Sequence, residues 1–174
     1  IYFYYRIEEN SSEFKLCIDD ILRRIKNMGP VVDSNEAMRC EYISAILHAS
    51  LYIVKRITTN KELTLAPQLE IIREESTDRV DYAIKALEEL LCITEGKLHQ
   101  VVMGFAQNLI QCESALQVNK KNRKRKSGEA FGDYFDYIYG IVTTASEWYF
   151  ILFTLDGISS TSKDPSIFDF QNLL

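Results

Sequence analysis

Hydrophobic positions in the first third of the chain recur every three or four residues, a spacing typical of helices. The first such segment, 11 to 27, ends at Gly29-Pro30, a pair that stops helices. A second helix is predicted from about Ser34 through the fifties, and Asp33 and Glu36 have the spacing of a capping box at its start. This second segment is apolar on most sides, yet it contains Glu41.

After a polar turn containing Pro67, the pattern changes to short runs typical of strands. Three strands are predicted, LEIIRE (69–74), RVDYAIKAL (79–87) and LLCITEGK (90–97), and their short connections predict an antiparallel meander. The helical period returns over about 99–117. FDYIYGIVTTA and EWYFILFTLDG then predict two more strands.

This order of elements predicts an α+β domain. Its core is αβββαβ, a mixed sheet flanked by helices, with an extra N-terminal helix and a C-terminal strand. With 174 residues, 47% of them hydrophobic, the chain is expected to form one domain. The expected parts are a helical extension (1–30), a core (about 34–155), a basic loop (119–130) and a loosely ordered tail (159–174). No apolar run reaches the roughly 18 residues of a membrane span, so no membrane partner is expected.

The four cysteines, at positions 17, 40, 92 and 112, form no CxxC pair. The two histidines are not placed to complete a zinc cluster with them. Buried free thiols in a reducing compartment are therefore the favoured interpretation.

The charge is unevenly distributed along the chain. The net charge is −5, but NKKNRKRK (119–126) contains six of the 20 Lys and Arg residues and is predicted to be a solvated loop. Three roles are open for it: a signal for a nuclear-import receptor, a loop that contacts phosphates, or a solubilising linker. The candidate nucleic-acid-binding residues are Lys120, Lys121, Arg123, Lys124, Arg125 and Lys126.

Two carboxylates and a lysine fall near the ends of neighbouring predicted strands. Glu95 and Lys97 share one face because side chains alternate along a strand. A turn at 88 and 89 would place Asp81 opposite residue 96. Two carboxylates this close repel one another unless a cation lies between them, and carboxylate oxygens are ligands that Mg²⁺ prefers. The alternative is a cross-strand ion pair at a sheet edge.

A divalent cation held by Asp81 and Glu95, Mg²⁺ or Mn²⁺, would support hydrolysis of a phosphodiester bond. Lys97 would orient the attacking water, assist its deprotonation or neutralise the transition state. The sequence therefore predicts a metal-dependent nuclease site.

These residues resemble the PD-(D/E)XK nuclease superfamily: Glu41 on a helix, Asp81 at a strand end and Glu95-Gly96-Lys97 on the next strand. Asp78-Arg79-Val80-Asp81 looks like the DRxD segment of the RecB-like exonuclease branch. The resemblance covers about 34–155. It implies a restriction-endonuclease-like fold, Asp81 and Glu95 as metal ligands, Lys97 as the catalytic lysine and Glu41 as an assisting carboxylate.

The RecB-like branch also carries a glutamine on the helix that follows these strands, often as QxxxY. Gln107 is the corresponding catalytic candidate, but Gln111 stands where that pattern has tyrosine. Gln107 and Gln111 belong to a polar stripe that is either a solvated helix face or a face directed to the site.

Three further segments, NEAMRCEYISAILHAS, ITEGK and FDYIYGIVTT, look like the C-terminal domains of fungal Crinkler-type proteins. Crinklers are effector-like proteins whose C-terminal domains are often nuclease-like and act in nuclei. The resemblance implies DNA cleavage, with RNA as the alternative substrate. It also implies a nuclear site of action, in a host after secretion through a leader upstream of Ile1.

The competing hypothesis is a catalytically inactive nuclease fold that binds DNA or a host nuclear protein. A homo-oligomer is compatible with either hypothesis.

Overall fold

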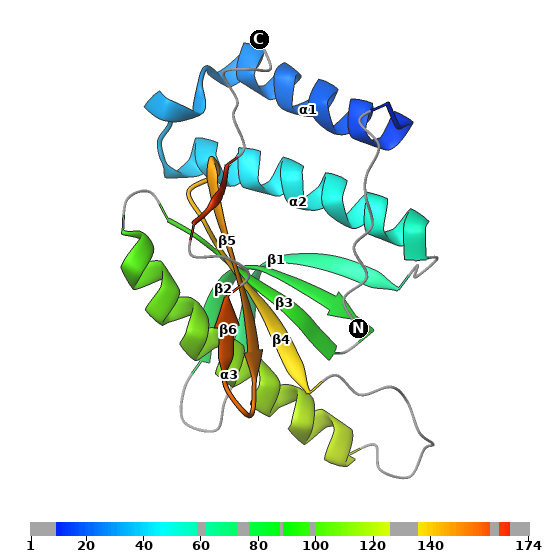
Figure 1. Ribbon diagram of the computed structural model, residues 1–174, viewed down its shortest axis with the longest axis vertical. Helices are drawn as coiled ribbons and strands as arrows, with labels where there is room; N and C mark the ends of the chain where they lie inside the picture. Colours follow the sequence, from blue (N-terminus) through cyan, green and yellow to red (C-terminus); the bar gives the residue numbers. More distant parts are fainter. Residues whose placement is uncertain are drawn as a thin grey trace. The chain divides into compact units, whose positions relative to one another are not determined.

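The chain has two compact units in the computed structural model, which describes residues 10–58, 62–72, 77–87, 89–97, 100–125, 136–160 and 164–167 (Figure 1). The described residues up to Thr58 form a helical unit, and those from Glu62 to Ile167 form a sheet unit. The second predicted helix therefore groups with the first one, whereas the sequence assigned it to the core that begins at about 34.

The helical unit contains α1 (Ser12–Met28), the short 3₁₀ helix η1 (Val31–Asp33) and α2 (Glu36–Thr58). α1 ends at Gly29, whose φ of +93° suits glycine. α2 is capped by Asn35, whose Oδ1 accepts a hydrogen bond from the Met38 amide at 2.9 Å. The capping box expected from Asp33 and Glu36 is therefore wrong, because Asp33 belongs to η1.

In the sheet unit, seven strands of the described residues form one mixed sheet. β1, β2 and β3 are the predicted antiparallel meander, β4 runs parallel to β3, and β5 runs antiparallel to β4. The helix α3 (Val101–Arg125) connects β3 to β4, so the predicted αβββαβ order and the α+β class are confirmed. The strands are β1 (Leu63–Ile72), β2 (Thr77–Ala86), β3 (Glu89–Gly96), β4 (Tyr137–Thr143), β5 (Glu147–Thr154), β6 (Ile158–Ser160) and β7 (Ser166–Ile167).

Both ends of the sheet differ from the sequence prediction. β1 begins six residues early and contains Pro67, which was expected in a turn. β1 lies at an edge of the sheet, where a residue without an N–H is tolerated. In the predicted tail, β6 and β7 pair with β5, so that part of 159–174 is strand and not loose chain. Residues 161–163 and 168–174 lie outside the described part.

The basic run is helical, and the prediction of a loop over 119–130 is wrong as far as Arg125. α3 continues because its last turns have partners in the sheet unit. Asn119 is buried and its amide pairs with the Leu90 backbone, while Arg123 binds Glu89 through two nitrogens. Basic residues are also favoured at a helix C-terminus by the helix dipole. Residues 126–135 lie outside the described part.

α3 packs on the sheet through small and polar residues as well as apolar ones. Buried polar positions on this helix include Asn108, Gln111, Ser114 and Asn119. A Cβ at Gly140 of β4 would overlap Asn108 Oδ1, so glycine lets the helix approach the strand. The buried hydrophobic cluster beneath α3 comprises Ile71, Val80, Ala83, Leu90, Ile93, Cys112, Ala115, Leu116 and Ile138.

All four cysteines are free thiols, as predicted, but Cys17 and Cys40 are only half-buried. Cys92 and Cys112 are buried in the sheet unit, and burial raises the pKa of Cys92 to about 12. Burial also raises the pKa of Cys112. These two thiols therefore stay protonated at neutral pH and act as core residues.

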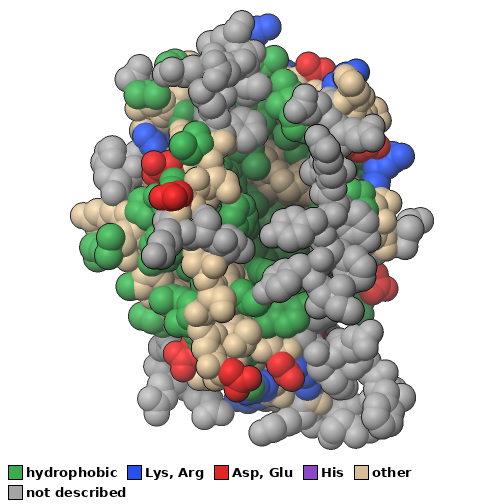
Figure 2. All heavy atoms as spheres, viewed as in Figure 1, with side chains coloured by type: hydrophobic (Ala, Val, Ile, Leu, Met, Phe, Trp, Pro, Cys, Tyr) green, Lys and Arg blue, Asp and Glu red, His purple; other side chains and the backbone are tan. Residues whose placement is uncertain are grey.

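Hydrophobic side chains also reach the surface, and they are prominent among the described atoms in Figure 2. The most exposed large ones include Val102 (82%), Ile167 (73%) and Ile72 (70%). Within the described residues, no helix is both long and apolar enough to cross a membrane.

Candidate active site

Glu95 lies at the end of β3, where this strand pairs with β4. Its Cα partner on β4 is Val142, and the amide of Lys97 donates a hydrogen bond to Thr143 O at 2.8 Å. Ile93, two residues earlier, belongs to the hydrophobic cluster under α3. Because side chains alternate along a strand, Glu95 follows Ile93 to the same face and is only 2% exposed.

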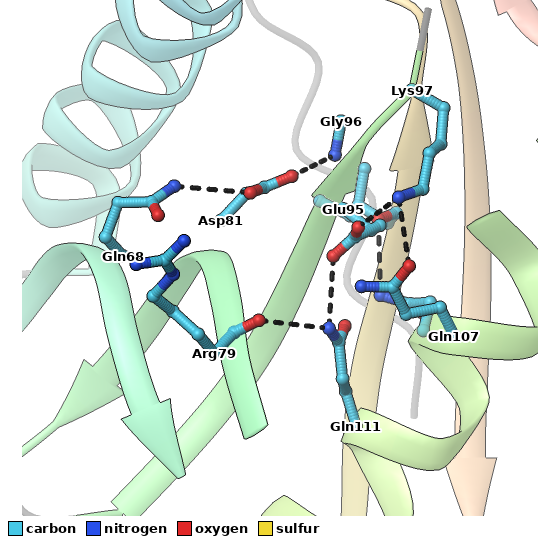
Figure 3. A network of polar contacts seen from close by, with 10 residues as sticks. Gln68, Arg79, Asp81, Glu95, Gly96, Lys97, Gln107 and Gln111 are labelled. Atoms are coloured by element: carbon cyan, nitrogen blue, oxygen red, sulfur yellow. Dashed lines mark hydrogen bonds and ion pairs between the residues drawn. The ribbon is translucent and has the colours of Figure 1, made fainter. Parts of the chain in front are cut away.

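The structure brings Lys97 and Gln107 to this buried carboxylate (Figure 3). Lys97 Nζ lies 2.6 Å from Glu95 Oε1 and donates a hydrogen bond to Gln107 Oε1 at 2.9 Å. A Cβ at Gly104 would lie 2.8 Å from Lys97 Cγ and 2.9 Å from Val142 Cγ1. Glycine at 104 therefore leaves the space through which the lysine side chain reaches Glu95.

Asp81 reaches the same strand end from β2. Its Oδ2 accepts a hydrogen bond from the Gly96 amide at 2.9 Å, and its Oδ1 accepts one from Gln68 Nε2 at 3.2 Å (Figure 3). Tyr82 pairs with Thr94, so the expected register, with Asp81 opposite residue 96, is wrong by one residue. The error comes from the turn, which lies between Ala86 and Glu89, one position earlier than expected, and would alone move the register by two residues. The bulge between Ile84 and Lys85 recovers one of these, so Asp81 follows the Tyr82–Thr94 pair to the position opposite Glu95.

The pKa of Glu95 is raised above its ordinary value. Burial is the largest cause, and the negative charge of Asp81 adds to it. Hydrogen bonds from Lys97 and Gln111 act in the opposite direction without cancelling the effect. Two carboxylates and one ammonium thus leave negative charge at a poorly solvated position.

Gln111 is a site residue to which the sequence analysis assigned no role. It is 2% exposed, and its Nε2 donates hydrogen bonds to Glu95 Oε2 at 3.1 Å and to Arg79 O at 3.5 Å. Its Oε1 is buried and finds no hydrogen-bond partner among the described residues. The signal in the sequence is its position one helical turn after Gln107, where the related pattern has tyrosine.

Asn108 fixes the helix that carries these glutamines. It is fully buried, and its Nδ2 donates hydrogen bonds to Ile93 O at 3.0 Å and to Ile141 O at 3.4 Å. One amide on α3 therefore bridges β3 and β4 directly beneath the site. This anchor ties the part of α3 that carries Gln107 and Gln111 to β3 and β4.

Glu41, the fifth candidate, lies on α2 in the helical unit. Its carboxylate Oε2 is 2.5 Å from Arg24 Nη1, and Arg24 also binds Asp20 at 3.2 Å. Glu41 is exposed. Within its own unit, this carboxylate is thus half of an ion pair between α1 and α2.

Of the basic candidates, Lys120, Lys121 and Arg123 have described side chains on the last turns of α3. Arg123 is only 13% exposed in its side chain and is held by Glu89 at 2.8 and 3.1 Å and by Asp136 at 3.2 Å. Lys124 and Arg125 are helical, but their side chains, like Lys126 as a whole, lie outside the described part.

The oxygen donors at the end of β3 fit a hard divalent cation. They are the carboxylates of Asp81 and Glu95 and the Gly96 carbonyl between Glu95 and Lys97. The described residues contain no cluster of three or more His, Cys, Asp or Glu that could hold a metal ion. Lys97 offsets only one of the two negative charges of Asp81 and Glu95, and the negative charge of Asp81 contributes to the raised pKa of Glu95. A further cation near the two carboxylates would reduce their mutual repulsion.

Comparison with known proteins gives one informative similarity. The chain is 29% identical over 139 residues to Crinkler effector protein 1 of Rhizophagus irregularis. The match covers 79% of this chain and 28% of that protein, so the chain spans less than a third of its relative. No family model matches the chain, and no solved structure matches it significantly. The similarity supports the predicted relation to Crinkler effectors and does not address the nuclease superfamily.

Proposed function

We propose that the sheet unit is a Mg²⁺- or Mn²⁺-dependent nuclease, with Asp81, Glu95 and Lys97 at its centre. The observation that supports this proposal best is the state of Glu95. It is almost fully buried and has a raised pKa, yet it lies between a lysine and a glutamine beside a second carboxylate. A buried carboxylate with a raised pKa and a specific charged partner is a candidate functional residue.

In this proposal, Asp81, Glu95 and the Gly96 carbonyl would hold the cation. When bound, Mg²⁺ or Mn²⁺ would polarise a phosphoryl oxygen and lower the pKa of a water molecule. Lys97 donates hydrogen bonds only, so its ammonium can hold the attacking water and neutralise charge that develops on the phosphate oxygens. Gln107 fixes the position of that ammonium, since its Oε1 accepts from Nζ at 2.9 Å.

Gln111 would keep Glu95 in one orientation. Its Nε2 donates a hydrogen bond to Glu95 Oε2, while Lys97 contacts Oε1 of the same carboxylate. Each carboxylate oxygen therefore has one defined partner. A carboxylate fixed in this way loses less conformational entropy when it binds a cation.

The comparison supports an effector role, and the basic residues support a nucleic-acid substrate. The name of the Rhizophagus relative describes an effector, and we propose the same role for this chain, with DNA as substrate and the nucleus as site of action. Lys120, Lys121 and the basic residues at 124 to 126 would contact phosphates or an import receptor. Arg123 is left out because Glu89 and Asp136 already bind its guanidinium.

The test is cleavage of plasmid and linear DNA with Mg²⁺, Mn²⁺ or EDTA. Wild type is expected to cleave only with metal. Asp81→Ala should abolish cleavage, and Lys97→Ala should lower the rate by about 10²- to 10³-fold. Glu70→Ala, which removes an exposed carboxylate of β1, is the matched control and should cleave like wild type. Equal cleavage by all four proteins would exclude this site.

The second candidate is a catalytically inactive domain that binds DNA or a host nuclear protein. It is favoured by the direct 2.6 Å contact between Lys97 and Glu95, which pairs both charges without a metal. In that case DNA binding would be salt-sensitive, would survive Asp81→Ala, and would occur without cleavage in any metal.

A further inference from the structure

A groove opens beside the candidate site, between the start of β2 and the first half of α3. Its volume is about 500 Å³. One wall is Thr77, Asp78 and Arg79, and the other is formed by Met103, Ala106, Gln107, Ile110 and Gln111. Apart from Gln107 and Gln111, none of the lining residues has a role in the proposed nuclease site, and none belongs to the basic run.

The groove is continuous with the site through two glutamines. Gln107 lines it and also accepts the hydrogen bond from Lys97 Nζ. Gln111 lines it and also donates to the Glu95 carboxylate. A molecule in the groove therefore lies one side chain away from the residues proposed to act on the phosphodiester.

The two walls differ in chemistry. Met103, Ala106 and Ile110 are three and four positions apart, so they share one face of α3, and all three are exposed. Met103 is 63% and Ile110 is 53% exposed, which is unusual for large apolar side chains next to a polar site. The facing wall carries a hydroxyl, a carboxylate and a guanidinium.

We propose, on the basis of the nuclease function above, that this groove binds one unpaired base of the substrate strand. A volume of about 500 Å³ lies within the range of about 300 to 1,000 Å³ typical of small-molecule sites and is far too small for a double helix. The apolar face of α3 matches the flat face of a base, and the polar wall offers hydrogen bonds to its edge. The substrate is therefore a single strand or a frayed end, and closed duplex is disfavoured.

The test fills the groove and measures binding in EDTA, where no metal-dependent cleavage occurs. Ala106→Trp places a large side chain in the groove without altering Lys97, Glu95 or either glutamine. Val102→Trp is the matched control, because Val102 is 82% exposed on the same helix and does not line the groove. The probes are a fluorescein-labelled single-stranded oligonucleotide, the same backbone with abasic residues, and a duplex whose ends are closed by abasic loops, compared by fluorescence anisotropy.

Wild type and Val102→Trp are expected to bind the base-containing strand about tenfold more tightly than the abasic strand or the duplex. Ala106→Trp should lose this preference while its affinity for the abasic strand stays unchanged. The proposal is overturned if wild type shows no preference for the base-containing strand, or if Ala106→Trp keeps it.

These outcomes are separable from those of the cleavage test. Wild type could prefer the base-containing strand, lose this preference in Ala106→Trp, and still cleave no DNA. That result would support the groove as a base-binding site and would refute the nuclease function. Cleavage that depends on Lys97, in a protein without base preference, would do the reverse.

Discussion

The two ends of β3 each carry a glutamate that pairs with a basic side chain, Glu89 with Arg123 and Glu95 with Lys97. The two pairs differ in how completely the surrounding polar groups are hydrogen-bonded. At the start of the strand, Arg123 binds both oxygens of Glu89, and Asn119 uses both halves of its amide on the Leu90 backbone. At its end, Glu95 is buried with a raised pKa, and Gln111 Oε1 finds no partner among the described residues.

This contrast separates polar residues that hold the fold together from those proposed to act. A satisfied network stabilises the fold, whereas buried charge without full compensation lowers stability and is typical of sites that bind a ligand. Both clusters attach α3 to the same strand. The helix is therefore anchored firmly at its C-terminal end and presents a polar, incompletely paired surface toward its N-terminal end.

The largest effect on stability is expected for Asn119→Ala. The substitution leaves the buried N–H and C=O of Leu90 without the partners they have at 2.9 and 2.8 Å. Unpaired buried groups cost about 1 to 3 kcal/mol each, so the free energy of unfolding should fall by about 3 kcal/mol. Urea denaturation measures this change. Asn122→Ala, three positions along the helix, serves as control and should stay within about 0.5 kcal/mol of wild type.

A smaller loss is expected for Arg123→Lys. Lysine keeps the charge but cannot reproduce the two nitrogens that bind Glu89, so the free energy of unfolding should fall by about 1 kcal/mol. The slope of log DNA affinity against log salt concentration should stay unchanged in this variant. The guanidinium of Arg123 is bound by Glu89 and Asp136, so we expect it to neutralise no phosphate and to release no counterion. Lys120→Gln should instead reduce the slope by about one. A reduced slope for Arg123→Lys would show that Arg123 contacts phosphate after all.

The smallest effect, and one of opposite sign, is expected for Glu95→Gln in metal-free protein. Because the folded pKa of Glu95 is raised above the ordinary 4.5, the folded state keeps a proton that the unfolded chain has already lost. The free energy of unfolding therefore falls as the pH rises from 4.5 through the folded pKa of Glu95. Above that pKa the carboxylate is charged in both states, and the cost of burying its charge is complete. Neutral glutamine removes the penalty, so the variant should be slightly more stable than wild type at pH 7.

The gain from Glu95→Gln should vanish below pH 4.5, where the carboxyl is protonated in both states. Denaturation in EDTA at pH 7 and at pH 4 measures both points. A variant that is less stable than wild type at pH 7 would mean that Glu95 is a structural residue like Glu89, and the contrast between the two ends of β3 would disappear.

The similarity to Crinkler effector protein 1 covers most of this chain but only 28% of that protein. The sheet unit contains both ends of β3, and its proposed chemistry can be tested on this chain alone. The full-length relative's activity stays a separate question for experiment.

The sequence by itself determined what depends on local spacing. Periods of two and of three to four residues gave the order of helices and strands, and a separation of two residues put Glu95 and Lys97 on one face of β3. These features need no distant partner. They follow from the geometry of a strand or helix and from which residues avoid water.

Only the tertiary structure decided which polar residues of α3 are buried and where the helix ends. The rotation and length of a helix depend on partners distant in sequence, here Leu90 and Glu89 for its last turns and Ile93, Glu95 and Ile141 for its first half. The local sequence predicted a solvated loop for the six basic residues, because the carboxylates of Glu89 and Asp136 that bind Arg123 lie 34 and 13 positions away. Burial of Gln111 depended in the same way on distant partners, because the Glu95 carboxylate and the Arg79 carbonyl that it binds lie 16 and 32 positions away on β3 and β2.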